Sequence, residues 1–260
     1  MKRTPNPTAV LVISIGNTRT AVTRVVGDRV GRVFRRPTDA CGGPVCEEMI
    51  REALGGRPVV GAVIGSTAPS RVKNWQRAWR NREGDALIVT PALDPGLPMS
   101  YPGRKTLGAD RLADLCGGAA RYGLPLIVVD VGTAMTVNVM TKPKGFIGGL
   151  ILPGPDLFLR VLSDGTALLP RLSSDIPPRR RAFGRTTEES MRLGASLGCA
   201  ALLEGLVRRL RRQLRQPDLP VVITGGGARR LRPVFDPPAR FDPTLTLFGL
   251  ARLFELHRAG

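Results

Sequence analysis

Short apolar runs alternate with longer amphipathic stretches along this 260-residue chain. Such alternation is typical of an α/β fold with mixed sheets. In the first half it predicts strands at 9–15, 20–26, 29–34, 58–64 and 86–90. Helices are expected at about 44–54, 69–82 and 109–121, and the last of them ends where Gly123 and Pro125 stop it.

The second half opens with strand-type runs and continues with helices. We expect strands at 125–131, 134–141, 145–151 and 219–223, a helix ending near 164, a long helix at about 186–215 and a final helix from Thr244. Thr186 and Glu189 have the spacing of a capping box at the start of the long helix. An apolar stripe on that helix is expected to be core, and in a helix this long it can also reach a dimer partner. It comprises Met191, Ala195, Leu202, Leu206, Leu210 and Leu214.

The same strand–turn–strand arrangement occurs twice, about 115 residues apart. The apolar run 9–13 leads into Gly-Asn-Thr at 16–18, and the run 126–129 leads into Asp-Val-Gly-Thr at 130–133. Glycine lets the backbone approach a phosphate, and threonine offers a hydroxyl and an N–H to it. Either turn alone is more often ordinary β-turn chemistry. Together they predict a nucleotide phosphate chain held between two related domains.

Composition places the chain among soluble globular proteins. Its residues are 42% hydrophobic and 23% charged. No uninterrupted apolar run reaches the roughly 18–20 residues that cross a bilayer, and the N-terminal segment has no signal-type cleavage site. We therefore expect a cytoplasmic protein without a membrane. The four cysteines have no metal-type spacing and there is one histidine, which argues against a zinc site and a histidine base.

The net charge of +18 admits two interpretations. A basic surface attracts phosphorylated ligands or nucleic acid. Alternatively, arginine simply occupies tolerant surface positions. The arginine clusters at 179–181 and 208–212 carry few interleaved aromatics, and aromatics make up 5% of the chain, so stacking platforms for single-stranded nucleic acid are scarce. The charge alone does not exclude a nucleic-acid partner.

Three further places carry candidate chemistry. Asp110, preceded by the small residues Gly108 and Ala109, lies in the first turn of a predicted helix, where an acid stabilises the helix or accepts a proton from a substrate hydroxyl. The neighbouring Arg111 could bind an anion. Asp130 ends an apolar strand, where it is a turn residue or a ligand for a cation beside phosphate. The glycine-rich turn that follows Thr224 lacks Rossmann and P-loop spacing, and is weak evidence by itself.

Six segments occur in the order in which they occur in the type III pantothenate kinase family, which this chain resembles. They are 16–18, 107–111, 130–136, 148–154, 184–187 and 224–226, and the closing helix after Asp242 is also similar. The most specific part is Gly-Ala-Asp-Arg at 108–111, followed about twenty residues later by Asp-Val-Gly-Thr-Ala at 130–134.

The resemblance covers nearly the whole chain and implies the sugar kinase–actin superfamily. Its fold consists of two ribonuclease-H-like (actin-like ATPase) domains with mixed sheets and a central cleft. We expect one domain at 1–121, with the first phosphate loop and the substrate segment. A second is expected at 122–260, with the second phosphate loop, a long dimer-type helix and an adenosine turn.

The resemblance further implies ATP-dependent phosphorylation of pantothenate to 4′-phosphopantothenate, the first step of coenzyme A synthesis. Asp110 resembles the catalytic proton acceptor, and Asp130 the ligand of a monovalent cation, potassium or ammonium. Mg²⁺ and a homodimer are also implied. Positions matching the pantothenate contacts are Tyr101, Gly108, Ala109, Asp110, Arg111 and Thr187. Positions matching the ATP contacts are Ser14, Ile15, Gly16, Asn17, Thr18, Arg19, Thr20, Ala21 and Thr133.

Two positions depart from the family pattern. Ser14 stands where the family has an aspartate that organises Mg²⁺ on the ATP phosphates, and Asn138 stands where it usually has another aspartate. A neutral hydroxyl is a weak ligand for a hard cation. Three interpretations follow: an active enzyme with a re-routed metal site, a slow enzyme, or a catalytically inactive relative that binds phosphate or nucleic acid as a regulator.

Overall fold

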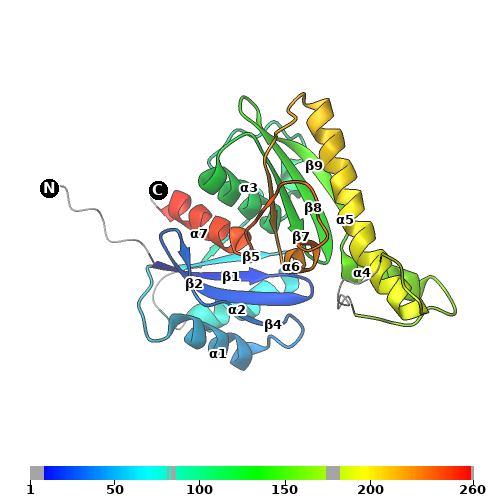
Figure 1. The fold of residues 1–260 in the computed structure, drawn as a ribbon. Coiled ribbons are helices and arrows are strands. Elements are labelled where there is room, and N and C mark those ends of the chain that lie inside the picture. The colour runs from blue at the N-terminus through cyan, green and yellow to red at the C-terminus, as the bar shows by residue number, and fades with distance from the viewer. Residues whose placement is uncertain (1–8, 81, 83–85, 174–181, 259–260) are drawn as a thin grey trace. The chain divides into compact units, whose positions relative to one another are not determined.

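The computed structural model describes residues 9–80, 82, 86–173 and 182–258, which form two compact units (Figure 1). The first unit comprises the described residues of Met1–Leu124, Pro143–Ile147 and Thr244–Gly260. The second comprises those of Pro125–Lys142 and Gly148–Pro243. The arginine cluster at 179–181 lies outside the described residues.

The first unit is built on a mixed sheet with strand order β3-β2-β1-β5-β6 and with β4 also paired to β2. Strands β1 and β2 form an antiparallel hairpin, and β5 and β6 continue the sheet in parallel. The expected strand 29–34 is two separate strands, because the Gly31 N–H bonds to the Arg24 carbonyl and the chain leaves the ladder there. The strand bounds are β1 Ala9–Ile15, β2 Arg19–Val26, β3 Arg29–Val30, β4 Phe34–Pro37, β5 Ala62–Ser66 and β6 Ala86–Ile88.

Helices cover both faces of this sheet (Figure 1). On one face α1 (Gly43–Leu54) and α2 (Val72–Arg80) bury Met49 and Trp75 against the apolar side of β1. On the other face, α3 (Ala109–Tyr122) and α7 (Leu245–Arg258) contact the sheet. Short 3-10 turns at Pro69–Arg71 and Arg104–Thr106 precede α2 and α3.

The final helix belongs to the first unit, which differs from the expected second domain at 122–260. Helices α3 and α7 pack backbone to backbone: a β-carbon on Gly249 would collide with the Ala113 carbonyl oxygen. The short segment Pro143–Ile147 also joins the first unit. Hydrophobic periodicity identified α7 as a helix but carries no information about the sheet on which it packs.

The second unit repeats the arrangement with strand order β11-β10-β7-β8-β9. Strands β7 and β8 are antiparallel. Strand β10 is parallel to β7, and β11 is parallel to β10. The strand bounds are β7 Leu126–Val131, β8 Ala134–Thr141, β9 Gly145–Pro153, β10 Val221–Thr224 and β11 Arg240–Phe241. The helices are α4 Pro155–Asp164, α5 Thr187–Gln213 and α6 Ala228–Leu231.

Helix α5 begins with the predicted cap, since the Thr186 hydroxyl accepts a bond of 3.1 Å from the Glu189 N–H. The predicted apolar stripe is only partly correct: Met191 and Ala195 are buried, but Leu202 is 47% exposed. Further along, the buried positions are those of Cys199, Leu203 and Val207, so the core-facing side of the helix is rotated from the leucine stripe. The buried side chains are Met191, Ala195, Ser196, Cys199, Ala200, Leu203 and Val207.

By length and composition alone, α5 could also cross a membrane, with a mean hydropathy of 1.2 over an 18-residue window. We expected no uninterrupted apolar run long enough to cross a bilayer. That expectation still holds, because Arg192 and Glu204 interrupt the apolar sequence of α5. Of the window, 44% is buried in the protein, and core helices of soluble proteins pass the same test. The helix is weak evidence for a membrane.

Candidate functional site

The first glycine turn closes the β1–β2 hairpin. The Gly16 N–H donates to the Arg19 carbonyl at 3.0 Å, so Asn17 and Thr18 form the tip. Ser14 is paired with Ala21 on β2 and with Gly65 on β5, which puts these three residues in one row across the sheet. Asn17, Thr18 and Arg19 are exposed to solvent, and a phosphate can therefore reach the tip of the turn.

Thr38, which the sequence analysis missed, directly follows β4 and holds this turn. Its buried hydroxyl donates to the Gly16 carbonyl at 2.7 Å and lies 3.0 Å from the Thr20 hydroxyl. The Thr38 N–H donates to the Thr18 carbonyl at 3.0 Å. These bonds fix the loop conformation before any ligand arrives. No sequence signal marks Thr38, because it joins the turn from 22 positions away.

The catalytic candidate Asp110 lies in the first turn of α3, as expected. Its Oδ1 accepts a bond of 2.8 Å from the Arg111 N–H, and the side chain is half-buried. Burial raises the pKa of this carboxyl, although the Arg111 N–H and the Arg111 charge act in the opposite direction. A carboxylate with a raised pKa is a stronger proton acceptor than an ordinary exposed aspartate.

Arg111 lies on an aromatic pair next to Asp110. Its guanidinium carbon is 5.9 Å from the Tyr101 ring centre and 5.5 Å from the Phe146 ring centre, and the two rings are 4.9 Å apart. The segment Pro98–Ser100 bonds to the backbone of Phe146 on both sides and so positions Tyr101. Phe146 was missed by the sequence analysis, and its only signal is its place just before the glycine pair at 148–149.

Asp130, the candidate cation ligand, is the penultimate residue of β7 and lies between two threonines of the neighbouring strands. It is paired with Thr136 on β8 and with Thr224 on β10, so the three side chains share one face of the second sheet. Thr224 is fully buried, and its hydroxyl has no hydrogen-bond partner. Asn138 is also fully buried, with its Nδ2 3.4 Å from the Thr136 hydroxyl. A carboxylate beside a buried hydroxyl without a partner fits a cation that takes oxygen ligands.

Two glycine-containing segments of the second unit pack against the turn that contains Asp130 and Thr133. The Gly154 N–H donates to the Thr133 carbonyl at 3.0 Å, and a β-carbon on Gly154 would collide with the Gly132 carbonyl. Gly225 has a φ of 90° and lies against the Asp130 carboxylate, where a β-carbon would also collide. The structure thus brings the Asp130–Thr133 turn, the start of α4 and the glycine-rich turn together within one unit.

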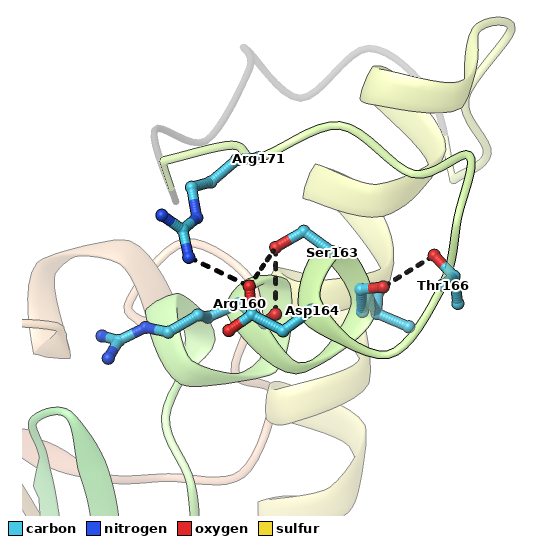
Figure 2. Close-up of polar contacts among 6 residues, drawn as sticks. Arg160, Ser163, Asp164, Thr166 and Arg171 are labelled. Atoms are coloured by element: carbon cyan, nitrogen blue, oxygen red, sulfur yellow. Dashed lines mark hydrogen bonds and ion pairs between the residues drawn. The ribbon is translucent and has the colours of Figure 1, made fainter.

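Thr187 lies elsewhere in the second unit, at the start of α5. It lines a pocket of about 740 Å³ whose other lining residues are Leu162, Leu169, Gly184, Arg185, Thr186, Ser190 and Met191. Figure 2 shows polar contacts at the end of α4 and in the segment after it: Arg171 pairs with Asp164 at 3.0 Å, and Thr166 bonds back to the Leu162 carbonyl at 2.8 Å. Of the residues in these contacts, Leu162 lines the pocket.

The predicted site residues therefore form groups within each unit. Tyr101 and 108–111 cluster around the start of α3, and Ser14–Ala21 form the hairpin end, both in the first unit. Asp130 and Thr133 share the turn of the second unit, and Thr187 lines the pocket there. The expected cleft between the domains stays a prediction. Among the described residues, no group of three or more histidine, cysteine, aspartate or glutamate side chains could hold a metal.

Solved structures confirm the predicted fold class. The chain is similar to a Campylobacter jejuni protein described as a Baf family transcriptional activator, with a TM-score of 0.59 and 19% identity over 96% of this chain and 100% of that one. A ROK family glucokinase from Streptomyces griseus, solved with glucose and AMPPNP, is similar with a TM-score of 0.50 and 14% identity, over 97% of this chain and 100% of that one. At such identities the likeness is evidence of fold alone.

Sequence comparisons identify the family. The family model described as type III pantothenate kinase matches residues 10–209. The type III pantothenate kinase of Thermomicrobium roseum is 35% identical over 259 residues, which cover 96% of this chain and 98% of that protein. Both matches extend over most of the chain and include the first glycine turn, Asp110 and Asp130. The chain therefore belongs to the type III pantothenate kinase family.

Proposed function

We propose that this protein is a kinase that transfers the γ-phosphoryl group of ATP to the terminal hydroxyl of pantothenate. The product is 4′-phosphopantothenate, and the reaction opens coenzyme A biosynthesis. Family membership over most of the chain is the observation that carries this function. The two glycine turns and the half-buried Asp110 are what phosphoryl transfer requires, because that reaction depends on positioning and charge stabilisation more than on covalent help.

Asp110 is the proposed proton acceptor for the pantothenate hydroxyl. Its position at the start of α3 leaves the carboxylate beside backbone N–H groups, and burial increases its basicity. Arg111 is proposed to bind the pantothenate carboxylate, since its guanidinium lies over two rings beside Asp110 and a guanidinium binds a carboxylate through paired N–H donors. Tyr101, Gly108, Ala109 and Thr187 complete the proposed substrate positions.

The ATP phosphates are proposed to bind the two glycine turns. Residues Ser14–Ala21 would contribute the first, and Thr133 belongs to the second. The fixed geometry of both turns supports this assignment, because Thr38 holds the first and Gly154 contacts the second. Preorganised N–H groups stabilise phosphate charge without reorganising during the reaction.

Two cations are proposed to accompany the reaction. Mg²⁺ would enter as part of the nucleotide substrate and neutralise charge on the transferred group. A potassium or ammonium ion would be held by Asp130, and the buried Thr224 hydroxyl without a partner supports a cation at this place. A single carboxylate with neutral oxygens suits a monovalent ion better than a strongly hydrated divalent one.

Ser14 and Asn138 led to three interpretations of the sequence. We propose the first of them, an active enzyme with a re-routed metal site. Asp110, Asp130 and Thr187 are all present, and none of the comparisons favours an inactive relative. The Campylobacter jejuni protein described as a transcriptional activator is only 19% identical to this chain, which is too distant to argue for nucleic-acid binding.

A homodimer in the cytoplasm completes the proposal. Apolar side chains in the second unit are exposed on three elements: Leu202 on α5 is 47% exposed, Val161 on α4 60% and Ile151 on β9 65%. Contiguous apolar patches mark interfaces, and we propose that these three side chains belong to one such patch. Light scattering on the purified protein should give the dimer mass, and Leu202→Asp should give the monomer. A monomeric wild type would contradict the dimer.

The decisive test is ADP release with ATP, pantothenate, Mg²⁺ and potassium, with mass spectrometry of the product. Wild type should release ADP only when pantothenate is present and should form 4′-phosphopantothenate. Asp110→Asn should remain folded and lose turnover. The informative comparison is Ser14→Asp, which restores the family residue. A silent wild type whose turnover appears only in Ser14→Asp would show that the natural protein is not this kinase.

A further inference from the structure

A row of small side chains crosses one face of the first sheet and ends at an arginine. On β5, β1 and β2 the row consists of Gly65, Ser14 and Ala21. Its next member is Arg35 on β4, which is paired with Ala21. Directly paired residues point to the same face of a sheet. Arg35 therefore lies on the face of Ser14, opposite to the face buried under α1 and α2.

Arg19 lies diagonally across from Arg35 on this face. It precedes Ala21 by two residues on β2 and is itself the last residue of the glycine turn. Long side chains on diagonal neighbours reach one another. Burial lowers the pKa of Arg35, and the positive charge of Arg19 lowers it further, which agrees with two guanidiniums held close together.

No carboxylate of the described residues balances this pair of like charges. In the described part of the chain, neither Arg19 nor Arg35 forms an ion pair with a carboxylate. The neighbouring Arg36 offers a contrast, since it points to the other face and lies 3.6–3.9 Å from Glu52 and Glu48 of α1. Like charges opposed across strands destabilise a sheet, and an anion between them removes that cost.

The pair is also held at a fixed place beside the turn. Thr38, three residues after Arg35, bonds to both sides of the turn through its hydroxyl and its N–H. The C-terminal end of β4 therefore cannot shift relative to the Gly16–Arg19 loop without breaking those bonds. Arg35 is thus positioned by the bonds that shape the proposed phosphate loop.

We propose that Arg35 is an additional nucleotide-positioning residue, which together with Arg19 binds the phosphates of ATP at the first glycine turn. The proposal rests on the proposed function. Arginine binds phosphate through two parallel N–H donors and keeps its charge without a metal. Ser14 in the same row is neutral and replaces the aspartate that would recruit a cation. Arg19 and Arg35 therefore supply the positive charge at this place. Nucleotide binding should consequently depend only weakly on Mg²⁺.

Calorimetry with ATP, in excess Mg²⁺ and separately in EDTA, tests this proposal. Wild type should bind ATP in EDTA within about tenfold of its affinity in Mg²⁺. Arg35→Gln should weaken binding in EDTA by about 10- to 100-fold, the range expected for hydrogen bonds to charged groups. The loss in Mg²⁺ should be smaller, because the cation then screens the phosphates. Arg36→Gln is the matched control and should stay within about twofold in both conditions.

Two further measurements separate charge from structure. Arg35→Lys should recover part of the affinity, because it keeps the charge but loses the paired donors. Thermal unfolding of Arg35→Gln should match that of wild type or rise, since a repulsion is removed. Equal ATP affinities for Arg35→Gln and Arg36→Gln in EDTA would overturn the proposal. Wild-type ATP binding without phosphorylation of pantothenate would instead refute the proposed function, while the Arg35 comparison would still decide the phosphate contact.

Discussion

Gly154 lies directly against the backbone of Gly132. A β-carbon on Gly154 would collide with the Gly132 carbonyl oxygen and would lie 2.8 Å from the Thr133 carbonyl oxygen. The Gly154 N–H meanwhile donates to that same Thr133 carbonyl. The turn proposed to bind phosphate in the second unit is thus shaped by a glycine from another segment.

Gly154→Ala should therefore distort the second turn. We expect the free energy of unfolding to fall by about 2–3 kcal/mol, because backbone atoms cannot move aside as a flexible side chain can. The KM for ATP should rise in the same variant. Urea unfolding and steady-state kinetics measure the two effects. Gly194→Ala is the control: its site on α5 is open, so stability should be unchanged or rise by up to about 1 kcal/mol.

Asp110→Asn should abolish most catalysis, with turnover lower by about 10²- to 10⁴-fold, as for loss of a general base. Asparagine can still accept the Arg111 N–H, so ATP binding should be retained. In wild type the carboxylate must be ionised to accept a proton, and its pKa is raised. The value of kcat/KM should fall with acid at a pH above the ordinary aspartate value of about 3.9. A flat profile down to that pH would contradict the role.

The same raised pKa has a consequence for stability. Burial makes the folded protein favour the protonated form of Asp110. The resulting stabilisation is complete at pH values below the pKa of this aspartate in the unfolded chain. It is lost as the pH rises through the higher pKa that Asp110 has in the folded protein. Asp110→Asn should therefore stabilise the protein more at pH 7 than at pH 4 in urea unfolding. The exposed Asp28→Asn serves as control, and equal changes at both pH values for Asp110→Asn would argue against burial as the cause.

Phe146→Leu should weaken pantothenate binding selectively. Leucine keeps most of the buried volume but removes the ring that faces the Arg111 guanidinium at 5.5 Å. A partly desolvated cation–π contact contributes about 1 kcal/mol or more, so the KM for pantothenate should rise at least fivefold with the KM for ATP unchanged. Phe248→Leu removes the ring under Arg121 in the same unit. It should cost stability and leave both KM values as they were.

Sequence patterns gave the local structure well and the long-range contacts poorly. The strands around both glycine turns and the α5 cap follow from apolar runs and from Thr186 with Glu189, which are local signals. The contact of Arg111 with Phe146 joins distant parts of the chain, and no periodicity encodes it. The leucine stripe on α5 misled for a related reason: which side of the helix packs on the core is set by distant contacts, and these bury Cys199 and Leu203 in place of Leu202.

Thr38→Val tests whether the first turn depends on its support from the residue that follows β4. Valine keeps the shape of threonine but removes the hydroxyl that donates to the Gly16 carbonyl and contacts Thr20. Leaving buried polar groups without partners costs about 1–3 kcal/mol, so the unfolding free energy should fall by that amount and the KM for ATP should rise. Thr23→Val is the matched control in the same sheet, because its equally buried hydroxyl has only a 3.4 Å bond to the Arg24 carbonyl. If both variants lose stability and ATP affinity alike, the turn does not depend on Thr38 and the preorganisation argued for Arg35 loses its basis.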